Sequence, residues 1–368
     1  MKNDPKQELL INGGTVLNNS EDKGMDEAET EVLLVFVGSP LLDISTRFEE
    51  KILEQYDLKI DGCVRAAEKH CALFQDLFLD QDSVLVAGGS AQNSARIAKR
   101  TLGSKGEVAF TGCTGCDEYE EWMKNQLRSE GVLPLYVTVP EEKTGVCACM
   151  TCDGMRSMCT RQGAAAKFAK EHLFLEPVNS KLKMANCIFV VGYFLGHSPD
   201  VVLNLAELCS PTQVFSLSLS AEYICRDYSE VLLKVMPRVD VLFGNETEVK
   251  AFATAVGGPH ITTVEEAVKL VSKLQRPATL PSRILIITRG SDPVVVDDGS
   301  DHLLFFEVPE DVPVVDSVGC GDALAGAFLA TYIRTRDIDS SVRAGIDSAV
   351  QILQVHGCDA TSIRKSDI

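Results

Sequence analysis

The sequence predicts an α/β fold with a doubly wound, mostly parallel sheet, helices on both faces and a small β lid. Two observations support this prediction. Short apolar, β-branched runs alternate with segments of helical pattern, which favours parallel strands joined by crossover helices. Each run also ends in a loop of glycine and polar residues, where open α/β sheets bind their ligands. The 368 residues, 45% of them hydrophobic, suffice for one large domain.

The chain is acidic, with a formal net charge of −18 at pH 7. A protein of this charge is a poor general binder of nucleic acids and of anionic membranes. The sequence also has no apolar run of membrane-spanning length and no signal-peptide core near its first residue. We therefore expect no nucleic-acid or membrane partner and a cytoplasmic location, with the nucleus as an alternative. We also expect a monomer.

Thirteen cysteines are scattered through apolar segments. Cys147, Cys149, Cys152 and Cys159 lie close together in sequence, but no second paired cluster accompanies them. A zinc site needs four converging ligands, and these spacings match no familiar set. We interpret the cysteines as buried free thiols.

The first part of the chain predicts a tail and then a buried strand. Residues 1–31 are polar, end in a run of acids and lack periodicity, so we expect a disordered tail ahead of one domain over residues 32–368. The apolar run Glu31–Gly38 is typical of a strand buried on both faces. Asp43 follows that strand and would lie at the ligand-binding edge of the sheet, or else on the surface. The lid is expected from residues of roughly 43–65 and 134–165.

A second strand candidate, Ser83–Ala87, leads into a glycine turn and a helix that runs through Arg100. Glycines at this turn let a ligand approach the backbone closely, and a neighbouring asparagine offers both donors and an acceptor. The candidate binding residues of the turn are Gly88, Gly89, Ser90 and Asn93. A further strand, Val108–Cys113, precedes an acidic helix around Trp122.

Between Tyr136 and Thr160 the pattern changes to short strands separated by turns. This pattern predicts an antiparallel hairpin rather than a βα unit. Arg156 begins the returning strand of the hairpin. Its planar guanidinium could clamp a phosphate, and a solvent-facing strand arginine is the alternative.

Further β-then-loop units follow, with strands expected over Cys187–Val191, Val214–Leu219, Val239–Phe243 and Arg283–Thr288. After the third of these, Asn245 and Glu248 share one face of a helix's first turn, where their oxygens could hold the waters of Mg²⁺. The same spacing fits a capping box, and the sequence leaves both interpretations open. After the fourth, the candidates for contact with a nucleotide phosphate are Thr288, Arg289 and Gly290.

The most informative stretch is Pro313–Leu329. Its β-branched pair Val314–Val315 predicts a short strand. The turn Gly319–Gly321 would direct backbone amides to the positive end of the following helix dipole and create an anion site. Asp322, in the first helical turn, would stay ionised there and could take a proton from a hydroxyl. A plain helix N-cap is the open alternative.

These candidates share one predicted location, the carboxyl edge of a parallel sheet. Together they supply a general base, a helix end for developing charge, a phosphate clamp and a face for Mg²⁺, which are the parts that phosphoryl transfer needs. The sequence contains neither a G-x-x-x-x-G-K-[ST] loop nor the protein-kinase signature, which excludes those two classes.

The segment D-S-V-G-C-G-D-A resembles the signature of the ribokinase-like (PfkB) carbohydrate kinase family, roughly D-[TS]-x-G-[AC]-G-D. Other segments are similar to those of its adenosine-phosphorylating members: G-S-P-L-L-D-I-S, A-G-G-S-A-Q-N-S, L-S-A-E-Y-I and K-V-M-P-R-V-D-V-L-F-G-N-E-T-E. The resemblance spans about residues 32–360. It implies a ribokinase-like fold and a Mg²⁺-dependent transfer of phosphate from ATP to the adenosine 5′-hydroxyl.

The resemblance also implies roles for individual residues. The catalytic set would be the base Asp322, the turn Gly319, Cys320 and Gly321, and the phosphate clamp Arg156. The ribose would be held by Asp43, Gly89 and Asn93, and the purine would stack on Tyr193. Mg²⁺ waters would be held by Asn245 and Glu248. The other candidates for the substrate are Ser39, Gly88, Ser90, His197, Ser218, Tyr223 and Val318, and those for the nucleotide are Thr288, Arg289 and Gly290.

The chain departs from its adenosine-phosphorylating relatives on the nucleoside side. Ser39, Ser218 and Val318 stand where asparagines are typical, and His197 replaces a small apolar residue. Other departures are Glu222, Tyr223, Cys320 and Leu324. Each lost hydrogen bond would weaken substrate binding by about 1–3 kcal/mol. Three hypotheses stay open: an adenosine kinase of this family, a kinase for another nucleoside or sugar, and a catalytically weak nucleoside-binding relative.

Overall fold

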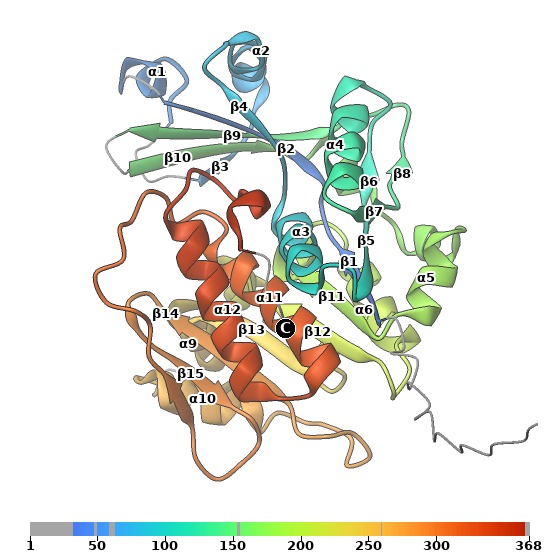
Figure 1. The fold of residues 1–368 in the computed structure, drawn as a ribbon, viewed down its shortest axis with the longest axis vertical. Helices are drawn as coiled ribbons and strands as arrows, with labels where there is room; N and C mark the ends of the chain where they lie inside the picture. The colour runs from blue at the N-terminus through green and yellow to red at the C-terminus, as the bar shows by residue number, and fades with distance from the viewer. Residues whose placement is uncertain (1–31, 48–49, 59–62, 153–154, 259, 365–368) are drawn as a thin grey trace, which may run out of the picture. The chain divides into compact units, whose positions relative to one another are not determined.

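The computed structural model describes residues 32–47, 50–58, 63–152, 155–258 and 260–364 (Figure 1). The expected tail over residues 1–31 lies outside the described residues. Across the described ranges, every helix is too short or too polar to cross a membrane.

The large sheet has nine strands in the order β16-β15-β14-β13-β12-β11-β1-β5-β7. Its strands are β1 Val32–Val37, β5 Gly106–Thr111, β7 Val132–Pro134, β11 Cys187–Val191, β12 Val214–Ser218, β13 Val241–Asn245, β14 Ile284–Arg289, β15 Asp292–Asp297 and β16 Leu304–Phe306. All pairs from β14 to β7 are parallel, and β15 and β16 add antiparallel strands at one edge. The predicted doubly wound, mostly parallel sheet is therefore confirmed.

Alternate residues of the central strand β1 enter two different cores. Leu34 and Phe36 pack into one core, and Leu33, Val35 and Val37 pack into the other. This alternation explains why the strand is apolar throughout, because both of its faces are covered. Helices of the first core include α3 Ser90–Leu102, α4 Glu118–Ser129, α11 Cys320–Thr335 and α12 Ile338–Leu353 (Figure 1). Helices of the second are α5 Val178–Met184, α6 Pro199–Leu208, α7 Glu222–Asp227, α8 Ser229–Val235, α9 Glu246–Gly257 and α10 Val264–Ser272.

A five-stranded sheet, called the small sheet below, has the order β3-β10-β9-β2-β4. Its strands are β2 Leu41–Arg47, β3 Cys63–Arg65, β4 Val84–Gly88, β9 Gly145–Cys152 and β10 Met155–Arg161. The antiparallel pairing of β9 with β10 confirms the predicted hairpin. The remaining strands and helices are β6 Cys113–Thr114, β8 Val137–Thr138, α1 Glu50–Gln55 and α2 Cys71–Leu79. Short 3-10 turns are η1 Glu68–His70, η2 Gly163–Lys167, η3 Lys170–Phe174, η4 Gly192–Gly196 and η5 Ala360–Ser362.

Two local expectations are wrong. Asp43 does not directly follow the first strand at the edge of the parallel sheet, because the chain turns at Pro40 and resumes as β2, which holds Asp43 in the small sheet. Val314 and Val315 form no strand either. Both are exposed in a loop, where the Val315 amide donates to the Leu353 carbonyl oxygen at 2.8 Å. The β propensity of two residues is too weak to form a strand without a neighbouring strand to pair with.

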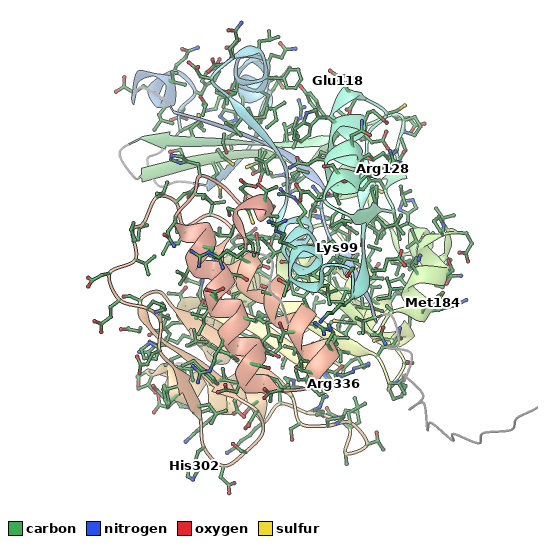
Figure 2. The ribbon with its side chains drawn as sticks, in the orientation of Figure 1. Lys99, Glu118, Arg128, Met184, His302 and Arg336 are labelled. Carbon is green, nitrogen blue, oxygen red and sulfur yellow. The ribbon has the colours of Figure 1, made fainter. Side chains whose placement is uncertain are left out.

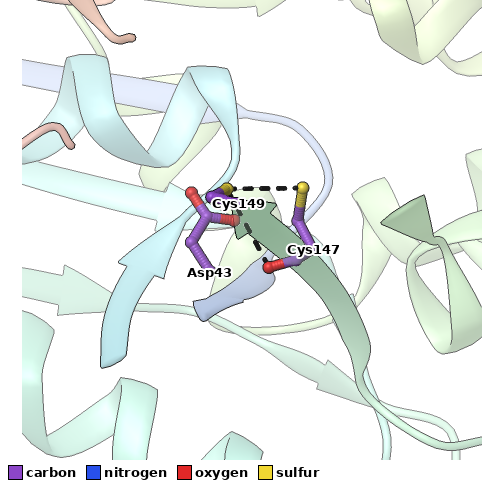
Figure 3. Close-up of side chains that lie close together, drawn as sticks. All are labelled: Asp43, Cys147 and Cys149. Carbon is purple, nitrogen blue, oxygen red and sulfur yellow. Dashed lines mark hydrogen bonds between the residues drawn. The ribbon is translucent and has the colours of Figure 1, made fainter. Parts of the chain in front are cut away.

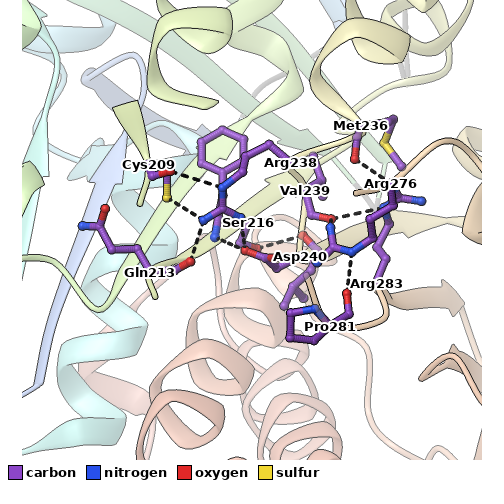
Figure 4. A network of polar contacts seen from close by, with 12 residues as sticks. Cys209, Gln213, Ser216, Met236, Arg238, Val239, Asp240, Arg276, Pro281 and Arg283 are labelled. Carbon is purple, nitrogen blue, oxygen red and sulfur yellow. Dashed lines mark hydrogen bonds and ion pairs between the residues drawn. The ribbon is translucent and has the colours of Figure 1, made fainter. Parts of the chain in front are cut away.

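Hydrogen bonds of charged side chains connect helices and strands away from the carboxyl edge of the large sheet. Lys99, labelled in Figure 2, donates from Nζ to the carbonyl oxygens of Gly103 and Gly106, both at 2.8 Å, and so ties α3 to β5. A second network surrounds Asp240 (Figure 4). The Asp240 carboxylate accepts from Arg238 Nη1 at 2.5 Å, from Arg276 Nη2 at 2.5 Å and from the Phe215 amide at 2.7 Å.

We expect Asp240→Asn to lower the free energy of unfolding by about 3 kcal/mol, because it leaves two nearly buried guanidinium groups without their shared counter-charge. Urea unfolding followed by circular dichroism would measure this loss. The matched control is Asp339→Asn, since Asp339 also accepts two bonds from an arginine, Arg343, but both side chains are more than half exposed. Its cost should stay within about 1 kcal/mol. Equal costs for the two variants would contradict the prediction.

Candidate active site

A cavity of about 730 Å³ lies between the small sheet and the carboxyl edge of the large sheet. From β1 the strand order runs one way through β5 to β7, and from β11 it runs the other way through β12, β13 and β14. The reversal falls between β1 and β11. Residues that follow these two strands, Ser39 and Tyr193, line the cavity. The cavity therefore occupies the topological switch point, where open α/β sheets bind ligands.

Asp322 is held by two side chains from the first turn of α3. Ser90 Oγ donates to Asp322 Oδ1 at 2.5 Å, and Asn93 Nδ2 donates to Asp322 Oδ2 at 3.0 Å. Because both donors and the acid lie at helix N-termini, the N-terminal ends of α3 and α11 meet at the cavity. These two hydrogen bonds hold the Asp322 carboxylate in one position in the cavity wall.

Two glycines permit the close approach on which this contact depends. A Cβ at Gly326 of α11 would lie 2.4 Å from the Ser94 carbonyl oxygen of α3, so only a glycine lets the two helices pack this closely. Gly89 caps α3 with φ +93, and a Cβ there would lie 2.2 Å from the Ser39 carbonyl oxygen. A side chain at either position would displace Ser90 and Asn93 from Asp322.

The turn ahead of α11 presents a helix end to the cavity. Gly319 is the N-cap with φ +82, a left-handed conformation that favours glycine. Gly321 also lines the cavity, and a Cβ on it would meet no protein atom within 4 Å. The space beside Gly321 is therefore available to a ligand, next to the positive end of a 16-residue helix.

Asp43 of β2 is a second acid that lines the cavity. A Cβ at Gly88 would lie 1.9 Å from Asp43 Oδ2, so the glycine leaves the room that the carboxylate occupies. Asp43 Oδ1 is buried without a hydrogen-bond partner. Asn93 Oδ1 is likewise buried and unpartnered. These two oxygens can therefore accept hydrogen bonds from a ligand that brings donors into the cavity.

Burial raises the pKa of both acids. The pKa of Asp322 rises from 3.8 to about 6, because desolvation outweighs the hydrogen bonds from Ser90 and Asn93. The pKa of Asp43 rises to about 7, chiefly through desolvation and also through repulsion by Asp322, with Arg96 acting in the opposite direction. At pH 7 Asp322 is mostly ionised and remains basic enough to accept a proton.

Ser39 and His197, two departures from the family pattern, are bonded to each other. Ser198 Oγ donates to the Phe168 carbonyl oxygen at 2.7 Å, so at 2.9 Å it accepts from His197 Nδ1. His197 Nε2, 3.0 Å from Ser39 Oγ, is then the acceptor and Ser39 the donor. Burial and the charge of Arg65 lower the pKa of His197 to about 4, which keeps this neutral tautomer. Ser39 consequently turns only lone pairs toward the cavity.

Asn245 and Glu248 form the capping box of α9 and also line the cavity. Asn245 Oδ1 accepts from the Glu248 amide at 2.9 Å, and Glu248 Oε2 accepts from the Asn245 amide at 3.0 Å. Burial and the charge of Asp322 raise the pKa of Glu248. The carboxylates of Glu248 and Asp322 repel each other, and a divalent cation between their oxygens would remove this repulsion. Oxygen ligands suit Mg²⁺, so the residues present fit Mg²⁺ held through its waters.

The cavity brings together most of the residues predicted from sequence. Those that line it are Ser39, Asp43, Gly89, Ser90, Asn93, Tyr193, His197, Ser218, Tyr223, Asn245, Glu248, Thr288, Val318, Gly319, Gly321 and Asp322. Gly88 lies behind Asp43. Cys320 belongs to the helix end without lining the cavity. Tyr193 and Tyr223 are 42% and 48% exposed and so lie toward the rim.

Two predicted residues lie away from the cavity, and the position of a third side chain is not tested. Arg289 does not line the cavity, since its guanidinium pairs with Glu246 at 3.3 Å and with Asp292 at 3.6 Å. Gly290 forms the turn between β14 and β15, also away from the cavity. Arg156 belongs to β10, but its side chain is outside the described part of the structure.

Several supporting residues were not predicted. Arg96 is buried and links Glu130 with the carbonyl oxygens of Ala87 and Cys358. Asp316 accepts from the Val318 and Gly357 amides, both at 2.9 Å, and so fixes the turn before α11. Arg65 of β3 adds a cation to the cavity wall. Asp316 belongs to the D-S-V-G-C-G-D motif and could have been identified there, whereas no local signal marks the others.

Known proteins resemble this chain over most of its length. Residues 53–365 match the pfkB family carbohydrate kinase domain. An adenosine kinase of Schizophyllum commune is 35% identical over 319 residues, which cover 85% of this chain and 92% of the relative. Adenosine kinase 1 of Arabidopsis thaliana is 32% identical over 337 residues, or 91% of this chain and 97% of that protein.

Solved structures of adenosine kinases are also similar to this chain. The adenosine kinase of Anopheles gambiae, in complex with P1,P4-di(adenosine-5) tetraphosphate, superposes with a TM-score of 0.83 at 34% identity, covering 92% of this chain and 99% of that one. The adenosine kinase of Schistosoma mansoni in complex with 2-fluoroadenosine gives a TM-score of 0.80 at 25% identity, covering 89% and 96%.

The raised pKa of Asp322 predicts a variant that gains stability. Between pH 4 and 6 the folded state binds more protons than the unfolded state, so stability falls as pH rises through this range. We expect Asp322→Asn to unfold at higher urea than the parent at pH 8 and to match it near pH 4, because the amide carries no buried charge. Asn93 Oδ1, which has no hydrogen-bond partner in the parent protein, can accept from the amide that the substitution introduces.

Asp298→Asn is the control of opposite sign. Hydrogen bonds from Ser300 lower the pKa of Asp298, so its ionised form stabilises the fold above pH 4 and its loss should lower stability there. A gain for both variants, or a loss for both at pH 8, would contradict the assigned direction for Asp322.

Proposed function

Because this chain belongs to the pfkB family of carbohydrate kinases, we propose that it transfers the γ-phosphoryl group of ATP to the 5′-hydroxyl of adenosine. The observation that carries the proposal is the pair of acids in one cavity: Asp322 fixed at the N-terminus of α11, and Asp43 with a buried oxygen that lacks a donor. The relatives named adenosine kinase, at 35% and 32% identity over most of the chain, support the choice of acceptor.

The unpartnered acceptors orient the nucleoside. A ribose brings hydroxyl donors on adjacent carbons, and the wall offers Asp43 Oδ1 and Asn93 Oδ1 as buried acceptors. Binding would satisfy both oxygens at once and would favour the ionised form of Asp43. Asn93 donates to Asp322 with its other amide atom, so the same residue places the ribose relative to the base. The 5′-hydroxyl would then reach Asp322, with the purine toward Tyr193.

Asp322 acts as general base for the transfer. As the 5′-oxygen attacks the γ-phosphorus of ATP, the new P–O bond forms, the bond to the β,γ-bridging oxygen breaks, and the hydroxyl proton moves to Asp322. ADP leaves with the electron pair of the broken bond. A pKa of about 6 suits this step, because the carboxylate is ionised at pH 7 and is still basic enough to take the proton from the hydroxyl.

The negative charge that builds up on the phosphoryl oxygens meets the helix end at Gly319–Gly321. Asn245 and Glu248 would hold Mg²⁺ through water, and the ion would neutralise the phosphate oxygens of ATP. Arg156 would clamp the transferring phosphate from the small sheet. Thr288, which pairs with Asn245 on the neighbouring strand, also lines the cavity and can offer its hydroxyl to the nucleotide.

A kinase for a different nucleoside is the second candidate, and the Ser39–His197 pair is the observation that favours it. The hydrogen-bond chain from Phe168 to Ser39 leaves Ser39 as an acceptor toward the ligand. Such a wall favours a nucleoside that presents a donor there and disfavours one that presents an acceptor. An asparagine at this position would have offered both.

The test is ADP release in a coupled assay with Mg-ATP and a panel of adenosine, other nucleosides, ribose and fructose. Adenosine should give the highest kcat/KM. Asp322→Asn should lower kcat by about 10²–10⁴-fold, because the proton has no acceptor. Folding of the variant is checked by its urea transition.

Turnover of another nucleoside in preference to adenosine would replace the substrate while leaving the base in place. Binding of adenosine without any turnover would overturn the assignment as a kinase.

The two acids also predict separate pH effects. As pH falls through about 7, Asp43 takes up a proton in the free protein and loses an acceptor for the ribose, so KM for adenosine should rise. As pH falls through about 6, Asp322 is protonated and kcat should fall. Initial rates from pH 5 to 9 measure both. Asp339→Asn, on an exposed part of α12, should keep both transitions. A kcat that is flat down to pH 5 would contradict the role of Asp322.

A further inference from the structure

Two cysteines of the small sheet share the cavity with Asp43. Cys147 and Cys149 are two residues apart on β9, so their side chains lie on the same face of the sheet. Both line the cavity. β2 pairs in parallel with β9 in a register that sets Asp43 opposite Cys147. Figure 3 shows the three side chains close together. The register between two strands thus brings thiols and a carboxylate together.

The three ligand atoms are close enough to bind one ion. Cys147 Sγ and Cys149 Sγ are 3.7 Å apart, and these two sulfurs and a carboxylate oxygen of Asp43 all lie within 4.8 Å of one another. Two thiolates at about 2.3 Å from a tetrahedral ion are separated by about 3.8 Å. The sulfur spacing therefore already matches tetrahedral coordination, and only the carboxylate needs a modest rotation. Within the described residues this is the single cluster of three such side chains.

The surroundings suit a soft cation. Met158 of β10 pairs with Cys149 and lines the cavity with its thioether, which is also a soft ligand. Thr160 Oγ1 lies 3.1 Å from Cys147 Sγ and can donate to a thiolate there. Asp43 Oδ1 has no partner within the protein. The cavity side remains open for a water as the fourth ligand, as in zinc sites that keep an exchangeable position.

A disulfide is the other product that two close thiols could form. Alternate residues of an extended strand have Cα atoms about 6.6 Å apart. This is near the upper end of the range of about 4.4–6.8 Å seen across disulfides. The strand geometry therefore favours a bridging ion over an S–S bond.

We propose that Cys147, Cys149 and Asp43 form a binding site for a thiophilic divalent cation of the Zn²⁺ class, and that the cation and the nucleoside exclude each other. On binding, two S–H bonds break, two metal–sulfur bonds form and two protons leave to solvent. A carboxylate oxygen of Asp43 becomes a metal ligand, and the carboxylate is then no longer free to accept from the ribose. This exclusion rests on the proposed function, whereas the cation site itself does not.

Cd²⁺ is the probe, since its thiolate complexes give a charge-transfer absorbance in the ultraviolet. Titration of the reduced full-length protein should show a saturable cadmium–thiolate signal that Cys147→Ser/Cys149→Ser removes. The matched control is Cys71→Ser/Cys116→Ser, because these are exposed thiols away from the cavity. That control should keep the signal. Asp43→Asn should weaken Cd²⁺ binding by about 10-fold or more, because the carboxylate ligand is lost.

Equilibrium dialysis of Cd²⁺ with and without saturating adenosine tests the exclusion. Adenosine should weaken Cd²⁺ binding, and Cd²⁺ should weaken adenosine binding by the same factor. An unchanged charge-transfer signal in Cys147→Ser/Cys149→Ser overturns the site. Equal Cd²⁺ affinity with and without bound adenosine overturns the shared use of Asp43. If adenosine does not bind at all, the proposed function fails, while a signal that depends on Cys147 and Cys149 still supports the cation site.

Discussion

The contact between Asp322 and the first turn of α3 is the interaction on which the site depends. Ser90 and Asn93 fix both oxygens of the carboxylate, and they reach it only because α3 and α11 pack against each other at Gly326. These helices are separated by more than 200 residues in sequence, so the whole domain must fold before the base has its position. The cost of holding a charge there appears in its pKa, which burial raises to about 6. The protein thus gives up stability at neutral pH for a base that can accept a proton.

Sequence patterns predict what is repeated or local. Cys187–Val191 appears as a strand with the predicted bounds, because a strand covered on both faces is apolar throughout. The hairpin around residues 145–161 and the capping box of Asn245 with Glu248 were also readable, since turn residues and i, i+3 spacing act over short distances. The rule that ligand sites gather at the carboxyl edge of a parallel sheet accounts for Tyr193 and Ser218 in the cavity, whereas the turn after β4 leaves a strand of the small sheet.

The features that the sequence could not predict depend on contacts between residues far apart in the chain. Asp43 was expected directly after the first strand, at the edge of the parallel sheet, but β2 pairs with β4 and β9 and carries it into the small sheet. That same register places it beside Cys147, so a ligand set that the cysteine spacing alone did not suggest is completed by a residue about a hundred positions earlier. Ser39 and His197 each look like a lost contact in the sequence. Only the fold shows that they are bonded to each other.

The strand that carries Asp43 is joined directly to the large sheet. β1 of the large sheet continues through Ser39 and Pro40 directly into β2, with no intervening helix to absorb a displacement. A ligand that pulls on Asp43 therefore acts on the strand that leaves the switch point and on the sheet that covers the cavity. The nucleoside and a thiophilic cation would both engage the carboxylate of Asp43, the ribose through a hydroxyl and the cation beside the thiols of β9. One carboxylate cannot satisfy both partners at full strength, because a bound cation withdraws the negative charge that a ribose hydroxyl would bond to. Mutual exclusion is then a consequence of where β2 places one side chain, and it needs no conformational switch.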